Sequence, residues 1–264
     1  MNKKALLLGY SDLQGSPLQG IKHDHDNIKK FLQSPLGGCW DETEIISHIF
    51  ETHLNGKQNV SFVPNYIPDE ELDYLFILYS GHGRDGLLTP FSQSSPHNIP
   101  IKNFLSAIKA KKALVIIDAC RDISKNLKED FIFSFQSSLL ENEEKCPNKA
   151  DFEDALKKSQ EGITVCFTAN QQESALEFGN NLNPQLKGSL FINMLLRVLH
   201  EKGNNGIIYF NETLIEEVKV KMNNLLAQSG HTEKQTPELK AFSIQTKDFY
   251  HSNSLIVDFP FAVK

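Results

Sequence analysis

Two apolar runs, each leading to a reactive side chain, constrain the fold of this 264-residue chain most strongly. Strands are predicted at about residues 74–79, just before His82, and at 113–118, just before Cys120. Short continuous apolar runs are typical of strands that are buried on both faces of a parallel sheet. Neighbouring parallel strands end at the same carboxyl edge, where open α/β folds place their sites. The pattern therefore predicts that His82 and Cys120 meet at one edge of a sheet.

The other periodic segments of the sequence predict further strands and helices, which together indicate an α/β architecture. Residues 5–9 predict a buried strand in the central part of the sheet, a short β-rich piece is expected near 45–49, and residues 162–169 predict a later strand. Apolar side chains recur with helical spacing in four segments: residues 21–32, 101–109, 189–200 and 211–228. The second of these helices lies between the two strands that lead to His82 and Cys120, which favours a right-handed parallel crossover.

Length and hydrophobic content allow one large α/β domain or two small ones, and we predict a single domain over residues 1–264. Polar, charged sequence from residue 121 to residue 161 predicts a long, partly mobile insertion. Aromatic side chains indicate that the C-terminal segment also packs against the domain: Phe242, Phe249, Phe259 and Phe261.

The net charge and the spacing of the cysteines limit the binding partners and the cellular compartment that we expect. The net charge of −6 gives no electrostatic reason to expect nucleic acid or a membrane. No run reaches the roughly eighteen apolar residues that span a bilayer, and the start of the chain is too short for a signal peptide. The cysteines lack CxxC spacing, which predicts neither a zinc site nor a disulfide framework and indicates a reducing cytoplasm. Three of them are interpreted as packing thiols: Cys39, Cys146 and Cys166.

His82 and Cys120 have the chemistry of a base and its nucleophile. Cysteine attacks as a thiolate, and neutral histidine accepts a proton near physiological pH. The backbone N–H groups of Gly83 and Cys120 are expected to bind an oxyanion. Taken singly, a buried cysteine more often packs as a small hydrophobe and a histidine is more often a satisfied polar group. Their joint position at two strand ends favours acyl transfer.

Residues 80–83 (Ser-Gly-His-Gly) and 118–121 (Asp-Ala-Cys-Arg) resemble the catalytic motifs of the caspase-like cysteine peptidases, family C14 of clan CD. Four further segments resemble parts of that family: residues 18–24, 34–40, 188–192 and 235–239, the last being its Gln-Thr-Pro segment. The resemblance covers about residues 3–245. It implies a caspase-hemoglobinase fold, with a mostly parallel sheet of about six strands and helices on both faces. It also implies three regions: a large-subunit-like part (1–125), a linker-like insertion (126–161) and a small-subunit-like part (162–264).

The resemblance is closest to the bacterial metacaspase-like and orthocaspase-type proteins. Asp118 stands where the animal caspase signature has glutamine, and His82 is nearer to the cysteine than in that signature. Resemblance to metacaspases implies an acidic S1 pocket made by Asp24 and Asp118, with Ser80 on its wall, that binds Arg or Lys at P1. A guanidinium suits such a pair because it forms two-pronged hydrogen bonds with carboxylates. Taken singly, Asp24 would stabilise a helix N-terminus and Asp118 would bind nearby backbone.

The sequence therefore predicts a bacterial, cytoplasmic cysteine endopeptidase, a hydrolase that cleaves after Arg or Lys through an acyl-enzyme on Cys120. The expected partner is a protein or peptide substrate with a basic P1 residue, and the chain is expected to be a monomer or a homodimer. One alternative is an effector of programmed cell death or antiviral defence that is gated by a small signalling molecule or a regulatory protein. The other alternative is a catalytically silent binding module.

No cofactor or metal is expected, and calcium is the alternative because some metacaspases need it. Glu141, Glu143 and Glu144 form an acidic cluster without the ligand spacing of a calcium loop, and a solvated face is the simpler interpretation. A peptidase with a basic P1 preference would also have candidate self-cleavage sites in the insertion: Lys125, Lys128, Lys145 and Lys149.

Overall fold

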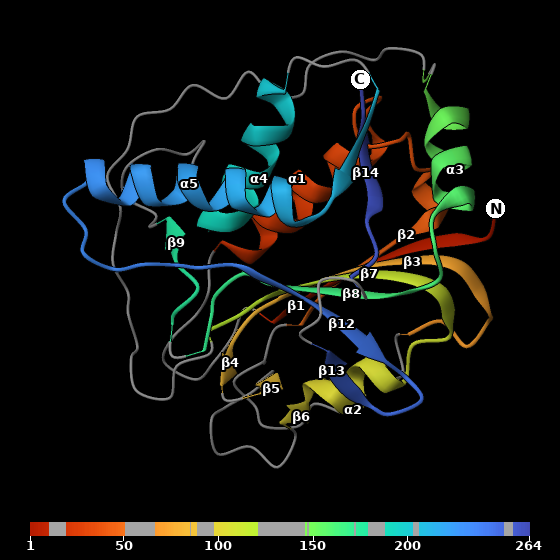
Figure 1. Ribbon diagram of the computed structural model, residues 1–264, viewed down its shortest axis with the longest axis horizontal. Helices are drawn as coiled ribbons and strands as arrows, with labels where there is room; N and C mark the ends of the chain where they lie inside the picture. The colour runs from red at the N-terminus through yellow and green to blue at the C-terminus, as the bar shows by residue number, and fades with distance from the viewer. Residues whose placement is uncertain are drawn as a thin grey trace.

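A mostly parallel sheet of seven strands runs through the computed structural model (Figure 1). The structure describes residues 1–10, 20–50, 67–84, 86–88, 98–120, 146, 148–171, 173–178, 188–202, 206–250 and 256–264. The strands of the sheet are β1 (Lys3–Tyr10), β2 (Ile45–Phe50), β3 (Leu72–Ser80), β7 (Ala110–Asp118), β8 (Gly162–Phe167), β12 (Glu238–Ser243) and β13 (Asp248–Tyr250). Their order is β13-β12-β8-β7-β3-β1-β2, in which β12 is antiparallel to both of its neighbours and all other neighbouring pairs are parallel. The predicted strands are confirmed, and the sheet has one strand more than the expected six.

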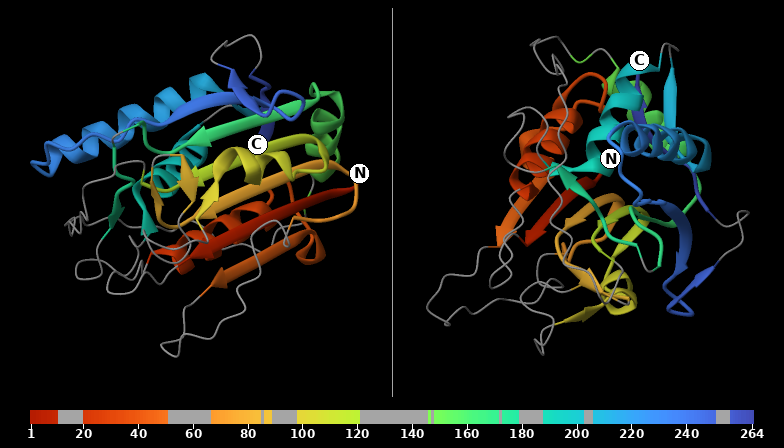
Figure 2. Two further views of the ribbon diagram at one scale, coloured as in Figure 1. Left: turned by 90° about the horizontal axis from the view of Figure 1, so that it is seen from below. Right: turned by 90° about the vertical axis from the view of Figure 1, so that its left-hand side faces the viewer.

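Helices cover both faces of this sheet, as predicted (Figures 1 and 2). One face carries α1 (Ile21–Gln33), α3 (Lys149–Lys158), α4 (Leu190–Glu201) and α5 (Glu212–Gln228), and the other carries α2 (Ile101–Ser106). Successive side chains of a strand point to opposite faces, so Ala5 and Leu7 join the core under α1 while Leu6 and Leu8 join the core beside α2. Both faces are therefore apolar, which explains the continuous apolar runs.

Short strands complete the fold around the sheet. A three-stranded ribbon is formed by β4 (Gly83–Arg84), β5 (Leu87–Leu88) and β6 (Ile99–Pro100), while β9 (Glu177–Phe178) pairs with β10 (Gly188–Ser189) and β11 (Ile207–Phe210) pairs with β14 (Phe259–Val263). The 3-10 turn η1 (Glu42–Glu44) precedes β2. Phe259 and Phe261 of β14 are almost completely buried in the core, which confirms that the C-terminal aromatic residues pack.

Side-chain caps set the starts of the two long helices of the second half. The Ser189 hydroxyl accepts a hydrogen bond from the Ile192 N–H (3.3 Å), and the Asn211 side chain accepts one from the Leu214 N–H (3.1 Å). The helix predicted at 101–109 ends earlier, at Ser106. Helix α3 was missed because only a narrow stripe of its polar sequence is buried: Phe152, Ala155 and Leu156. Among the described helices, none has the length and apolar character needed to cross a lipid bilayer.

The prediction of no disulfide is wrong. Cys39 and Cys146 form a disulfide, with 5.8 Å between their Cα atoms. The two cysteines are 107 residues apart in sequence, so spacing rules for short motifs could not reveal the pair. Further contacts hold α3 beside the same region, including an ion pair of 2.7 Å between Lys149 and Asp41. Cys166, in contrast, is a fully buried free thiol within the core, as predicted.

The disulfide leads to a prediction about a cleaved chain. Any single cut between residues 121 and 145 should leave two fragments that Cys39–Cys146 holds together. A recognition sequence for a site-specific protease, placed in this interval, provides the cut. We expect one band on a denaturing gel without reductant and two fragments with dithiothreitol, whereas Cys39→Ser should give two fragments in both lanes. Two bands from the unsubstituted chain without reductant would show that these cysteines are reduced.

Candidate active site

The register of β3 and β7 brings His82 and Cys120 to one edge of the sheet. Ser80 is paired with Asp118 at the ends of these parallel strands, and the Gly81 N–H continues the ladder by donating to the Asp118 carbonyl (3.1 Å). His82 and Cys120 therefore each lie two residues beyond a paired position. Both residues are of intermediate exposure, although the Cys120 thiol itself is largely buried. The structure thus places both residues at the same edge of the sheet, just beyond the ends of neighbouring strands.

Close backbone packing fixes the loop that carries His82. The Tyr79 hydroxyl donates a hydrogen bond to the His82 carbonyl (2.9 Å). A Cβ atom at Gly83 would lie 2.8 Å from both the Ala119 Cβ and the Cys120 carbonyl oxygen, so only glycine fits between the two loops. The backbone after His82 and the backbone of Cys120 are therefore in direct contact.

The Cys120 thiol is neutral in the substrate-free chain. Burial raises the pKa of Cys120 to about 11, and the nearby negative charges of Asp118 and Glu177 add to this rise. The thiol donates a weak hydrogen bond to the Ala175 carbonyl, with 3.7 Å between the sulfur and the oxygen. A thiolate is the attacking species, so a base or an incoming cation must favour loss of this proton.

Asp24 and Asp118 lie near each other in the interior. Both oxygens of Asp24 accept from the Ser189 N–H, at 2.9 and 3.1 Å, and its helix receives no cap from this side chain. The Thr168 hydroxyl donates to Asp118 (2.6 Å). Asp24 and Asp118 are both buried, and the fully buried Ser80 hydroxyl binds Asp24. The side chains contact residues far away in sequence, so local helix or backbone stabilisation does not account for them.

A third carboxyl group, Glu177, was missed by the sequence analysis. It begins β9, opposite Ser189 in β10, and its charge raises the pKa of Asp24. Burial, then the charge of Asp118, raises the pKa of Glu177 to about 7. Burial likewise raises the pKa of Asp118 to about 6 and, with its acidic neighbours, raises that of Asp24 well above its ordinary value. A strand of two residues has no periodicity, so no sequence signal marked Glu177.

Gly188 makes the cluster of carboxyl groups sterically feasible. Its φ of +98° is unfavourable for residues with a side chain, and a Cβ there would lie 2.2 Å from an Asp24 oxygen. The Ser189 N–H that follows is thereby aimed at Asp24. The cluster of Asp24, Asp118 and Glu177, called the acidic cluster below, is costly to ionise fully without a cation.

Because the acidic cluster is costly to ionise, we expect the effect of Glu177 on the stability of the folded chain to depend on pH. Between its ordinary pKa of 4.5 and its folded-state pKa of about 7, Glu177 binds a proton in the folded chain that the unfolded chain has released. The stability from this proton is present below pH 4.5 and is lost as the pH rises through 7. Glu177→Gln should therefore lie within about 1 kcal/mol of the original chain at pH 5 and exceed its unfolding free energy at pH 8 by roughly a further 1–3 kcal/mol.

Urea unfolding at pH 5 and pH 8 measures this difference. Glu216→Gln is the control, because Glu216 is exposed on α5, and it should change stability equally little at both pH values. An equal effect of Glu177→Gln at both pH values would contradict the raised pKa of Glu177.

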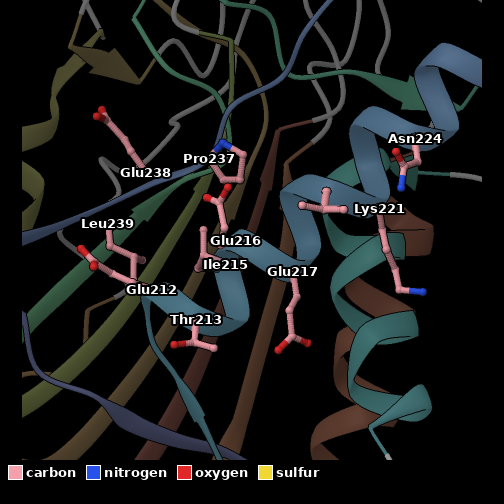
Figure 3. Close-up of a pocket in the computed structure, with 11 residues that line it drawn as sticks. Glu212, Thr213, Ile215, Glu216, Glu217, Lys221, Asn224, Pro237, Glu238 and Leu239 are labelled. Atoms are coloured by element: carbon pink, nitrogen blue, oxygen red, sulfur yellow. The ribbon is translucent and has the colours of Figure 1, made fainter.

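A separate groove lies between α5 and the start of β12 (Figure 3). Its volume is about 1010 Å³. Apolar side chains such as Ile215 and Leu239 meet acidic ones such as Glu216 and Glu238 along it. None of the described residues that line it is a cysteine or a histidine. The groove is therefore distinct from the edge that carries His82 and Cys120.

Other predicted positions can be located only in part. Lys149 is the first residue of α3 and is paired with Asp41, so cleavage after it would require the start of this helix to unwind. The described residues contain no group of three His, Cys, Asp or Glu side chains placed to hold a metal. Six candidates for calcium binding or self-cleavage lie outside the described residues: Glu141, Glu143, Glu144, Lys125, Lys128 and Lys145.

The chain is thus an α/β domain that carries a cysteine and a histidine at the ends of adjacent parallel strands, beside an acidic cluster. The family model of the peptidase C14 caspase domain matches residues 2–250, so the chain belongs to this family of cysteine peptidases. Its structure is similar to that of caspase-1 from Spodoptera frugiperda, with a TM-score of 0.51 and 15% identity over 90% of this chain and 87% of that chain. At this identity the similarity shows a shared fold, which confirms the predicted caspase-like fold. No curated protein matches the chain.

Proposed function

We propose that the chain is a cysteine endopeptidase that cleaves peptide bonds after Arg or Lys. The observation that carries this proposal is the position of the acidic cluster beside Cys120: Asp118 stands two residues before it, and Glu177 stands two residues after Ala175, whose carbonyl accepts from the thiol. A P1 cation in that cluster would place the following carbonyl near the sulfur. An acidic P1 side chain would be repelled by the same carboxylates.

In the proposed reaction, His82 accepts the Cys120 proton as the sulfur attacks the P1 carbonyl carbon. The resulting oxyanion is bound by the backbone N–H groups of Gly83 and Cys120. Collapse of the tetrahedral intermediate breaks the peptide bond, His82 protonates the leaving amine, and a thioester remains on Cys120. A water molecule, deprotonated by His82, then hydrolyses the thioester and regenerates the free thiol.

The acidic cluster has two roles in this scheme. Asp24 and Asp118 hold the guanidinium or ammonium group of P1, Ser80 lines the wall, and Glu177 adds a third carboxylate. The cation also offsets the negative charge that raises the pKa of Cys120, so substrate binding favours the thiolate. A basic P1 residue would thereby be both the specificity determinant and an aid to nucleophile activation.

The neutral thiol also favours a second candidate function, an effector whose activity is gated. The Cys120 thiol donates a weak hydrogen bond to the Ala175 carbonyl in the substrate-free chain. A small signalling molecule or a regulatory protein that moved this carbonyl would activate the peptidase, as expected for bacterial defence or programmed cell death. Cytoplasmic location, independence of calcium, and a monomeric or homodimeric state stay predictions. Cys39–Cys146 removes the cysteine-based argument for a reducing compartment.

Fluorogenic peptides with Arg, Lys or Asp at P1 test the proposal, each with and without calcium. We expect cleavage after Arg and Lys that exceeds cleavage after Asp by at least about 100-fold, because the carboxylates attract one charge and repel the other. Preferred cleavage after Asp would contradict the assigned pocket. Silence with all three peptides would favour the gated effector or a binding module.

A further inference from the structure

Gln235 is a fully buried polar residue in the Gln-Thr-Pro segment, to which the proposed mechanism assigns no role. Its Oε1 accepts a hydrogen bond from the Leu176 N–H (3.0 Å), and its Nε2 donates to the Thr168 carbonyl (2.9 Å). Both partners belong to the connection between β8 and β9, described over residues 168–171 and 173–176 and called the β8–β9 segment below. One side chain therefore ties together the two ends of this segment.

Each anchor of Gln235 adjoins a residue of the candidate site. The Thr168 hydroxyl donates to Asp118 in the acidic cluster. Leu176 lies between Ala175, whose carbonyl accepts from the Cys120 thiol, and Glu177. Gln235 bonds the backbone groups of Leu176 and Thr168, so its influence on the site runs through the backbone of the β8–β9 segment.

The β8–β9 segment depends on such contacts because residues 173–176 belong to no helix or strand. Buried backbone groups outside secondary structure need other partners, and here the side chain of Gln235 supplies two of them. The Leu190 N–H binds the Leu176 carbonyl (2.9 Å), and Thr236 binds Glu173 through its N–H (2.6 Å) and hydroxyl (3.0 Å). The Gln-Thr pair thus fixes the segment on the side away from β7.

We infer that Gln235 is a positioning residue, which holds the β8–β9 segment so that Ala175 contacts Cys120 and Glu177 joins Asp24 and Asp118. The inference deepens the proposed peptidase function and rests on it for the effect on catalysis. The effect on the Cys120 thiol does not depend on that function.

Gln235→Ala, compared with Thr164→Val, tests the inference. Thr164 is a matched control because its buried hydroxyl also binds two backbone groups, the Val257 carbonyl (2.8 Å) and the Val257 N–H (3.1 Å). Both variants lose two buried hydrogen bonds to backbone groups, so the destabilisation from lost hydrogen bonds is shared. Only Gln235 anchors residues next to the site.

Three measurements distinguish the variants: steady-state hydrolysis of a P1 Arg peptide, inhibition by benzamidine as a small P1-like cation, and alkylation of Cys120 by iodoacetamide at pH 8. For Gln235→Ala we expect KM and the benzamidine inhibition constant to rise about 10-fold, because Glu177 leaves the cluster. Alkylation of Cys120 should become several-fold faster, because the thiol becomes more exposed and loses the Ala175 carbonyl as its hydrogen-bond acceptor. Thr164→Val should leave all three values within about twofold.

Equal behaviour of Gln235→Ala and Thr164→Val in alkylation and benzamidine affinity would overturn the inference. If Gln235→Ala does not fold, Gln235→Glu takes its place, since it keeps the length and the acceptor for Leu176 but loses the amide donor to Thr168. The same directions are expected, with smaller changes, and unchanged alkylation would again overturn the inference. If the chain hydrolyses no peptide, the peptidase proposal fails, while the alkylation comparison still decides the role of Gln235.

Discussion

Cys120→Ala should reduce hydrolysis of a P1 Arg peptide to the background rate, a loss of about 10⁴-fold or more in kcat/KM. The reason is that no acyl-enzyme can form without the sulfur. His82→Ala should cause a similar loss, and the double variant should be no worse, because a nucleophile and its base act as a unit. The rates are measured with a fluorogenic peptide at a single pH near neutrality.

Cys166→Ala is the matched control for Cys120→Ala. Cys166 is the other free cysteine of the described chain, fully buried in β8 and facing the core. Its loss should cost some stability through a small cavity but leave kcat/KM near the original value. Full activity in Cys120→Ala, or loss in Cys166→Ala without unfolding, would place the nucleophile elsewhere.

Asp118→Asn should lower kcat/KM for a P1 Arg peptide roughly 30- to 5000-fold, which corresponds to the 2–5 kcal/mol typical of a lost partner in a buried charge pair. The substitution keeps the oxygen that accepts from Thr168, so the fold should be preserved. A peptide with citrulline at P1 has nearly the same shape without the charge. Its much slower cleavage should change little, because the lost interaction is between charges.

Iodoacetamide gives an independent readout of Asp118→Asn. The charge of Asp118 contributes to the raised pKa of Cys120, so its removal should speed alkylation at pH 8. Asp248→Asn is the control, since Asp248 is an exposed residue of β13 that is paired with Lys102. Equal losses for the Arg and citrulline peptides would indicate damage to the site in general and would contradict a charge-based pocket.

Prediction of the caspase domain from sequence depended on local hydrophobic patterns, and these patterns were clearest in the long strands. The runs at 74–79 and 113–118 predicted β3 and β7, because strands buried on both faces carry apolar residues at every position. The helices α4 and α5 were also predicted nearly to their ends, since Ser189 and Asn211 are capping residues. Helix α3 was missed because just one stripe of it is apolar.

The residues of the candidate site also fall into two groups, those that the sequence identified and those that it did not. His82, Cys120, Asp118 and Asp24 could be selected because each stands in a motif that resembles a known family. Glu177 and Gln235 could not be assigned a place in the site, because each acts through a connection between β8 and β9 that has no periodic pattern. Their contacts join residues about 60 positions apart, such as Gln235 and Leu176, separated by 59.

By itself, the sequence determined the strands β1, β2, β3, β7 and β8, most helices and the two reactive side chains at the ends of β3 and β7, because these depend on local hydrophobic patterns and short motifs. Only the tertiary structure decided the Cys39–Cys146 disulfide, the addition of Glu177 to the pair of Asp24 and Asp118, and the fixing of the β8–β9 segment by Gln235. These features depend on distances between residues far apart in the chain, and such distances exist only once the sheet has formed.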